Sequence, residues 1–189
     1  MPRRTALTVA TLAGSVALAA AAPAAGSVPH PGHATITHGS SKIKLSKKTR
    51  KAMSHKHYTL TAIAPAKYKK HTLRSPIKSG TYENFSATVN TAGGFRISHG
   101  GTSVSIRKFQ SKSSAGSGSG TAIVTGHGRI KAVTTGEPSS VVPGNPVRAS
   151  GFTVTMAKPL VKALDGAFGT KLFKKHAKIG KGSVVFYYK

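Results

Sequence analysis

Apolar and polar side chains alternate along most of the chain after Lys42, and this two-residue period restricts the fold more than any other feature. Gly, Pro, Asn and Ser separate the alternating stretches, as expected of strands joined by turns. One face of each predicted strand is apolar and the other carries Ser, Thr, Lys or Arg, which is typical of antiparallel sheets. The predicted fold class is therefore mainly β, an antiparallel β-sandwich with two short helices. The clearest strands are Tyr58-Leu60-Ala62, Phe85-Ala87-Val89, Phe95-Ile97, Val104-Ile106, Phe152-Val154-Met156 and Val184 to Tyr188.

Two segments far apart in the chain share one pattern, a strand followed by a short helix. Residues 43–53 align without gaps with residues 154–164. In the second copy, Pro159 suits the first helical turn and Gly169 suits the helix end. Two interpretations stay open: a duplicated strand-helix unit, or two generic connections that converged by chance.

The first residues have the pattern of a targeting segment. Arg3 and Arg4 precede an apolar run from Ala6 to Ala22, and the small-residue pattern of residues 22–24 follows. This pattern predicts a signal peptide over residues 1–24, and a retained membrane anchor is the less favoured alternative. We expect a flexible leader over residues 25–41 and a single β-rich domain over residues 42–189.

Two segments inside the predicted domain have loop composition. Ser111 to Gly120 (SKSSAGSGSG) consists almost wholly of small residues, which predicts a flexible Gly/Ser-rich linker or a long hairpin loop over 111–120. Glu137 to Asn145 (EPSSVVPGN) is a second predicted loop because of its Pro and Gly content. Together the two loops are candidates for the rim of a site.

The composition excludes several classes of protein. The chain has no Cys, so neither a disulfide framework nor a thiolate metal site is available. Its only acids are Glu83, Glu137 and Asp165, whereas glycoside hydrolysis and two-metal catalysis need converging carboxylates. No Gly-x-Ser-x-Gly elbow or phosphate-binding loop occurs. We therefore expect a protein that is not an enzyme and has no dedicated metal site.

The order of motifs resembles a known family. A strand-helix is followed by SPIKSG (75–80), then by Gly94-Phe-Arg-Ile-Ser-His-Gly-Gly101, a strand ending at Phe109, the helical ALDGAFGTKLF (163–173) and a terminal strand. This order, over about residues 42 to 188, resembles secreted actinobacterial proteins related to the haem-transport-associated (HtaA-type) domain. The resemblance implies an exported, β-rich domain at the cell surface, some of whose members bind haem through a tyrosine with histidine support.

The chain departs from that family at one motif, and the haem candidates follow from the rest. The family's domain typically opens with a Gly-Trp motif and a nearby tyrosine ligand, and this chain has no Trp, so the motif does not identify the ligand. His99 and His127 are flanked by glycines, which let the backbone turn and admit a ligand, although such histidines are more often plain turn residues. The candidate cofactor-binding residues are His99 and His127, with Tyr58 and Tyr82 as axial oxygens.

The excess of positive charge suggests the main function. There are 29 Lys and Arg against 3 acids, a net charge of +26. The electric field of this charge raises the rate at which the protein encounters polyanions, and salt weakens the effect. Alternatively, the lysines only keep the surface soluble. The predicted function is a secreted or cell-surface, non-enzymatic protein held by anionic wall polymers, acidic polysaccharide or anionic lipid head groups, with extracellular nucleic acid bound only non-specifically. The alternative is an HtaA-like haem carrier. The candidate polyanion-binding residues are Lys67, Lys69, Lys70, Lys171, Lys174, Lys175 and Lys178.

Overall fold

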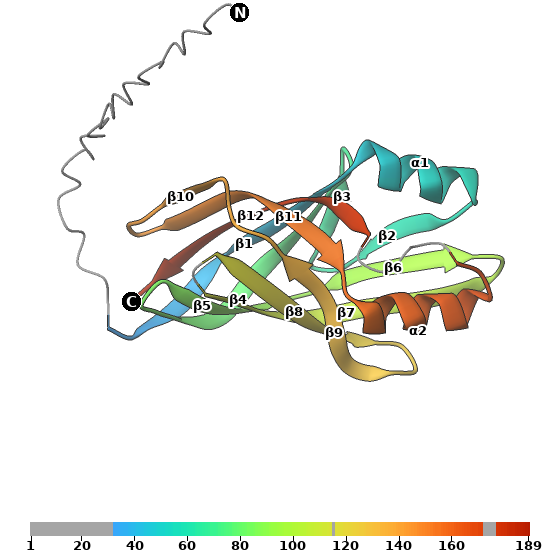
Figure 1. Ribbon diagram of the computed structural model, residues 1–189. Helices are drawn as coiled ribbons and strands as arrows, with labels where there is room; N and C mark the ends of the chain where they lie inside the picture. The colour runs from blue at the N-terminus through green and yellow to red at the C-terminus, as the bar shows by residue number, and fades with distance from the viewer. Residues whose placement is uncertain (1–31, 115, 172–176) are drawn as a thin grey trace, which may run out of the picture.

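The computed structural model describes residues 32–114, 116–171 and 177–189. In this part of the chain most residues lie in strands, and two short helices interrupt the strand order (Figure 1). The elements are β1 Ala34–Leu45, α1 Lys47–His55, β2 Thr59–Ile63, β3 Lys67–Lys69, β4 Thr72–Glu83, β5 Ser86–Thr91, β6 Gly94–His99, β7 Thr102–Ser114, β8 Ser117–Val124, β9 Gly128–Thr135, β10 Ser140–Val142, β11 Val147–Met156, α2 Lys158–Phe168 and β12 Lys178–Tyr188.

Among the described residues, eight strands close on themselves. The hydrogen-bonded order is β7-β5-β4-β1-β12-β11-β9-β8, and β8 also pairs with β7. All of these pairings are antiparallel. The expectation of a mainly β antiparallel fold with two helices is confirmed, but the sheet is a closed barrel with extra strands and not a plain sandwich. Closure leaves no free edge on the eight strands, which a sandwich of two open sheets would have.

The extra strands attach where a barrel strand changes partner along its length. The first half of β7 pairs with β6 and its second half with β5, so both partners share one edge. The change occurs at Lys108, which has a positive φ of 51° and whose N–H donates to the Gly93 carbonyl. β2 extends the sheet beyond β6, β3 lies on β4, and β10 lies on β11.

β1 is a central strand of the barrel. It lies between β4 and β12 and begins at Ala34. The predicted flexible leader over 25–41 is therefore wrong for residues 34–41, because this stretch is paired on both edges and its Ala34 and Ile36 side chains are buried. Thr35 and Lys189 exchange two backbone hydrogen bonds of 2.9 and 3.0 Å, so the two ends of the described fold lie side by side.

Both predicted strand-helix units are present, at the same register. Ser46 and Ala157, equivalent positions in the alignment, are the N-cap residues of α1 and α2. Pro159 lies in the first turn of α2, and Gly169 ends it with a left-handed φ of 63°, as predicted. Both helices lie at the same end of the barrel (Figure 1). Within the described residues, neither helix is long and apolar enough to cross a membrane.

The buried side chains form two clusters at opposite ends of the barrel. The larger one contains the apolar faces of both helices, including Met53, Leu160 and Leu164, and extends to Ile106 and Val124 on β7 and β8. The smaller one, around Ile36, Ile77, Tyr82 and Phe186, lies at the end away from the helices.

The predicted loop over 111–120 is wrong. Most of this segment lies in strands β7 and β8, which pair from Ile106↔Val124 to Ser114↔Ser117. Ladder hydrogen bonds to the neighbouring strands β5 and β9 compensate for the weak strand propensity of Gly and Ser. The second predicted loop, 137–145, holds only the three-residue strand β10.

Candidate functional site

Three chain segments converge on Tyr58 at the helical end of the barrel. The first is the connection from α1 to β2. Tyr58 lies there, directly before β2, and its N–H donates to the Met53 carbonyl at 2.8 Å. The second is the β6–β7 turn with His99, and the third is the end of α2 with Phe168 and Thr170. Tyr58 is 5% exposed, so this convergence encloses its ring.

The rings of these segments form an ordered cluster. The Tyr58 and His99 rings are stacked, with their centroids 4.2 Å apart and an interplanar angle of 16°. Phe168 meets both rings edge-on, with centroid distances of 5.1 Å to Tyr58 and 6.3 Å to His99. Such stacked and edge-to-face contacts stabilise ring positions beyond the effect of burial alone, so the phenol and the imidazole hold each other in fixed orientations.

Local backbone signals place these side chains. Gly100 and Gly101 both have positive φ values, 53° and 81°, as required by a two-residue type I′ turn. His99 is the last residue before this turn and pairs with Thr102, so its position is fixed by the hairpin. On the third segment, the left-handed Gly169 ends α2 and turns the chain so that Thr170 reaches Tyr58.

Two polar groups of the cluster are candidates for contact with a ligand. The Tyr58 hydroxyl is hydrogen-bonded to the hydroxyl of Thr170, an exposed residue, so the phenol oxygen points towards the surface of the molecule. His99 Nδ1 is buried and has no hydrogen-bond partner within the described residues. A buried polar atom without a partner is costly, and such an atom in a native structure calls for an explanation such as a missing ligand.

Basic residues lie next to the cluster along the chain. His55, Lys56 and His57 immediately precede Tyr58, and Lys171 follows Thr170; all four are exposed. The Lys56 ammonium donates to the Lys171 carbonyl at 3.1 Å, which joins the first segment to the third. An anionic ligand at Tyr58 would therefore meet positive charge on two sides.

The structure separates the four predicted cofactor residues. It brings Tyr58 and His99 together, whereas His127 is exposed in the β8–β9 turn, with its N–H donated to the Val124 carbonyl. Tyr82 lies in the other buried cluster, in ring contact with Phe186 and Tyr188. Burial, followed by the neighbouring Tyr188, raises the pKa of the Tyr82 phenol above its ordinary value, which disfavours the phenolate form there.

Sequence reasoning missed two members of the cluster. Phe168 and Thr170 both lie in the helical motif 163–173, but the sequence names neither as a site residue. Gly169 was the available signal for both residues. A helix that ends at this glycine turns the chain there, so the residues on either side of it come to lie against a neighbouring segment. Within the described residues, no three His, Asp or Glu side chains are grouped as metal ligands would be.

The predicted lysines lie on several separate elements. Lys67 and Lys69 are exposed on β3, Lys70 is in the turn that follows, and Lys171 and Lys178 lie beyond α2. Lys174 and Lys175 fall outside the described residues.

Comparisons with known proteins identify the fold. No protein-family model and no curated protein matches the sequence. Among solved structures, the chain is similar to the C-terminal domain of HtaA from Corynebacterium glutamicum, with a TM-score of 0.68 and 15% identity over 82% of this chain and 99% of that one. It is also similar to the heme binding protein HtaB from the same organism, with a TM-score of 0.58 and 8% identity over 83% and 96% of the two chains. The resemblance to the HtaA-type domain is thus confirmed as a shared fold.

Proposed function

We propose that this protein is a haem-binding carrier in which Tyr58 supplies the axial oxygen and His99 supports it. The stacked Tyr58–His99 pair is the observation that carries the proposal, because it joins a phenol and an imidazole at one point of the fold. The similarity to HtaB, which is a heme binding protein, gives independent support. The proposal takes up the alternative that the sequence left open and gives it a ligand residue.

The residues at this cluster fit haem chemically. A tyrosine phenolate is an established axial ligand of haem iron, and ferric haem would supply a Lewis-acidic centre for the Tyr58 oxygen. The His99 ring, stacked on Tyr58 with the centroids 4.2 Å apart, would hold the phenol in a fixed orientation towards the iron. The exposed Lys56 and Lys171, which lie next to the cluster in the chain, would supply ammonium groups for the two propionates.

Binding requires one existing contact to give way. The Tyr58 hydroxyl is engaged by Thr170, so the hydrogen bond between them has to be released before the oxygen coordinates a metal. Thr170 is exposed and lies just past the end of α2, where few buried contacts hold the chain. We expect Thr170 and Lys171 to move on binding while the barrel stays fixed. The carrier role is non-enzymatic, and export to the cell surface remains part of the proposal.

A haemin titration of the purified protein at high salt tests this function. High salt removes the unspecific attraction between a +26 chain and the propionates. We expect one-to-one saturation of the Soret band and a phenolate-to-iron(III) charge-transfer band. Tyr58→Phe keeps the ring but removes the oxygen, so both signals should be lost, and His99→Ala should weaken binding at least about tenfold.

Matched controls use the same substitutions at the other two candidates. Tyr82→Phe removes a buried phenol at the far end of the barrel, and His127→Ala removes an exposed turn histidine. Both variants should bind haemin as the unmodified protein does. Equal binding by Tyr58→Phe and Tyr82→Phe would refute the assignment of the ligand.

A second candidate function, retention by polyanions, is favoured by one face of the barrel. Strand pairing places Lys67 opposite Arg74 and Arg74 opposite Lys42, and it places Lys44 opposite Lys181. Directly opposed residues lie on the same side of a sheet, and like charges there are destabilising unless an anion neutralises them. We define the basic face as these exposed side chains together with Lys69: Lys42, Lys44, Lys67, Lys69, Arg74 and Lys181.

Elution from immobilised dextran sulfate tests the basic face. The triple variant Lys42→Gln, Lys44→Gln, Arg74→Gln should elute at clearly lower salt than the unmodified protein, because adjacent charges act together on a polymer. The control triple, Lys112→Gln, Lys131→Gln, Lys162→Gln, removes the same charge from exposed positions elsewhere. Equal elution of the two triples would mean that net charge alone determines retention.

A further inference from the structure

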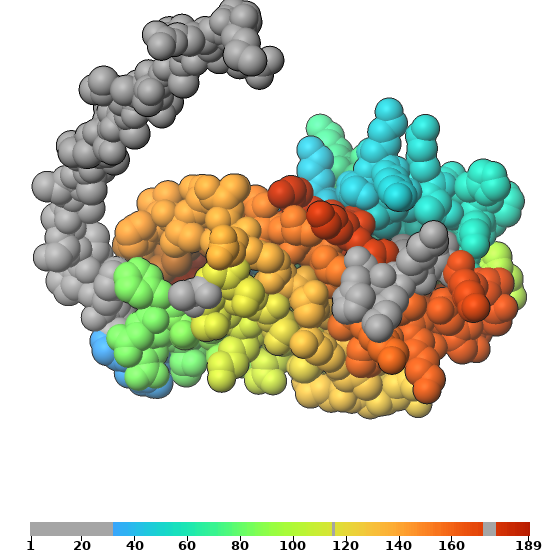
Figure 2. Space-filling model, in the orientation of Figure 1, coloured from blue at the N-terminus to red at the C-terminus, as the bar shows by residue number. Residues whose placement is uncertain are grey.

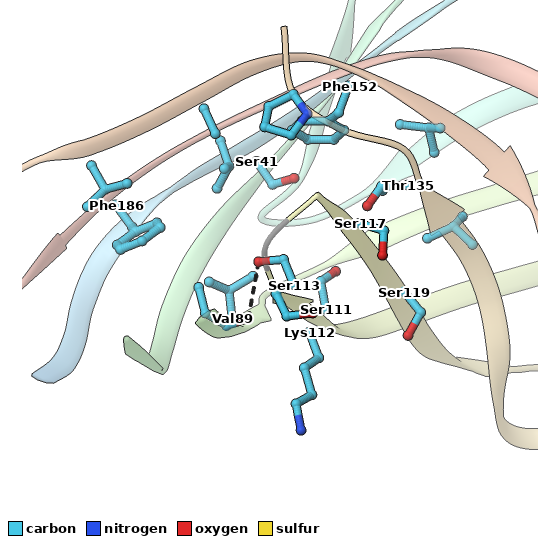
Figure 3. Close-up of a pocket in the computed structure, with 18 of the residues that line it drawn as sticks. Ser41, Val89, Ser111, Lys112, Ser113, Ser117, Ser119, Thr135, Phe152 and Phe186 are labelled. Carbon is cyan, nitrogen blue, oxygen red and sulfur yellow. Dashed lines mark hydrogen bonds between the residues drawn. The ribbon is translucent and has the colours of Figure 1, made fainter. Parts of the chain in front are cut away.

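The barrel interior is hollow at the end away from the helices. A cavity of about 500 Å³ lies there, within the range of about 300 to 1,000 Å³ that small-molecule sites occupy. We call it the barrel cavity. All eight barrel strands contribute to its wall, for example through Ser75 and Val147 and, as labelled in Figure 3, through Ser41, Val89, Ser111, Ser119, Thr135 and Phe186. An eight-stranded barrel is just wide enough either to be filled by side chains or to hold one small ligand.

The cavity exists because this part of the wall is built from Gly and Ser. Ser111 pairs with Gly120, which pairs with Val133, so the three lie on the same side of the sheet. Gly120 itself is closely covered: a Cβ atom added there would meet Val133 Cγ2 at 2.9 Å and Ser111 Oγ at 3.2 Å, so this position cannot take a larger residue unless its neighbours shift. In the helical half the same two strands carry Ile106 and Val124, both buried in the core. The small residues therefore leave a space that larger ones fill elsewhere.

The chemistry of the lining selects for an apolar occupant. Among the described lining residues Lys112 is the only charged one, and its side chain extends away from the cavity (Figure 3). The other polar side chains are those of Ser and Thr residues and the phenol of Tyr82, and most of the rest of the wall is aliphatic or aromatic. Because an unpaired charge is expensive to bury, a charged or strongly polar group is excluded from the interior.

The apolar lining continues from the interior to the mouth of the cavity. The mouth lies where the β4–β5 hairpin, the β7–β8 hairpin and the β10 segment meet (Figure 2). Phe85 and Val141, 55% and 51% exposed, line the cavity from two of these segments, so apolar contact continues out to the surface. Lys112, exposed on β7, provides a cation outside the wall for an acidic head group.

We propose that the barrel cavity binds a single long aliphatic chain of the fatty-acid class, with the chain inside and the carboxylate at the mouth. Tyr58, His99 and Phe168 do not line this cavity, so the site is separate from the proposed haem site. The two proposals stand or fall independently.

Titration with cis-parinaric acid, a linear fatty acid that fluoresces in apolar surroundings, tests the proposal. We expect saturation at one probe per chain. Ser111→Leu and Ser113→Leu fill the cavity and should each weaken binding at least about tenfold, because the added side chain occupies the ligand's volume. The matched control is Ser103→Leu, the same change at a position of the same strand that does not line the cavity, and it should bind normally.

A chain-length series on the unmodified protein decides the matter even if a leucine variant fails to fold. Saturated fatty acids should displace the probe about fourfold more tightly for each added methylene, and the gain should stop when the cavity is full. Binding that is unsaturable, or equal in all three serine variants, would overturn the proposal. So would one-to-one displacement of the probe by haemin in the Tyr58→Phe protein, because the cavity would then be a porphyrin site.

Discussion

Tyr82 and Tyr68 are two tyrosines through which folding stability depends on pH. Burial raises the pKa of both phenols above the ordinary value of about 10, and Tyr188 adds to the effect at Tyr82 whereas Arg50 opposes it at Tyr68. Below that pH both the folded and the unfolded chain hold the proton, so folding stability does not depend on it. Above it the unfolded chain loses the proton first, and stability falls as the pH rises.

We therefore predict that Tyr82→Phe makes the protein more resistant to alkali. The variant cannot ionise at this position, so its free energy of unfolding should fall less than that of the unmodified protein between about pH 10 and pH 12. Urea unfolding at pH 8 and pH 11 measures the difference. Tyr187→Phe is the control, because it makes the same substitution at a phenol that is 37% exposed. An identical pH dependence of Tyr82→Phe and the unmodified protein would contradict the argument.

At the scale of the element, the two helices begin at aligned positions with different chemistry. Ser46 caps α1, where its hydroxyl accepts the Thr49 N–H at 3.0 Å, whereas Ala157 at the same place in α2 makes no side-chain cap. α2 compensates with a proline in its first turn and four buried residues. α1 has only two buried residues, so it depends more on its cap.

Ser46→Ala should consequently destabilise the protein by about 1 kcal/mol. Thermal unfolding followed by circular dichroism would show the loss as a lower midpoint. The matched change Ser54→Ala lies in the same helix at an exposed position without a capping role, and it should leave the midpoint unchanged or slightly raise it. A midpoint that falls equally in both variants would show that the cap contributes nothing.

The elements that the sequence predicted are those with large alternating side chains. β5, β6, β11 and both strand-helix units follow from apolar residues two apart and from the glycine and proline at helix ends. β8 and the second half of β7 could not be predicted, because Gly and Ser carry no apolar alternation and these strands are held by pairing with remote neighbours. The composition that suggested a linker is the same composition that forms the cavity wall.

The candidate site was predictable only in part, for a similar reason. A glycine pair after His99 and a tyrosine at the start of a strand are local signals, and both residues were identified. That Tyr58 stacks on His99 and that Tyr82 lies at the opposite end depends on barrel closure, which joins strands from both halves of the chain. Closure rests on side-chain packing between distant segments, and a periodicity of two is equally compatible with a sandwich.

At the scale of the whole molecule, the uncompensated charge predicts an unusual response to salt. A net charge of +26 repels itself in the compact state, and the basic face concentrates part of it on neighbouring strands. We expect the thermal midpoint to rise between 10 mM and about 500 mM sodium chloride as screening increases. The Lys42→Gln, Lys44→Gln, Arg74→Gln triple should show a smaller rise than the Lys112→Gln, Lys131→Gln, Lys162→Gln triple. Equal rises would assign the effect to net charge alone.

The hydrogen bonds between Thr35 and Lys189 place the ends of the described fold close enough for circular permutation. Since the two ends of the described fold are adjacent strands, a short linker would join them without crossing the molecule. The exposed β8–β9 turn, with positive-φ glycines at 126 and 128, offers a place for new termini. A circular permutant opened there keeps every barrel pairing and begins with β9, so the barrel does not depend on which strand comes first.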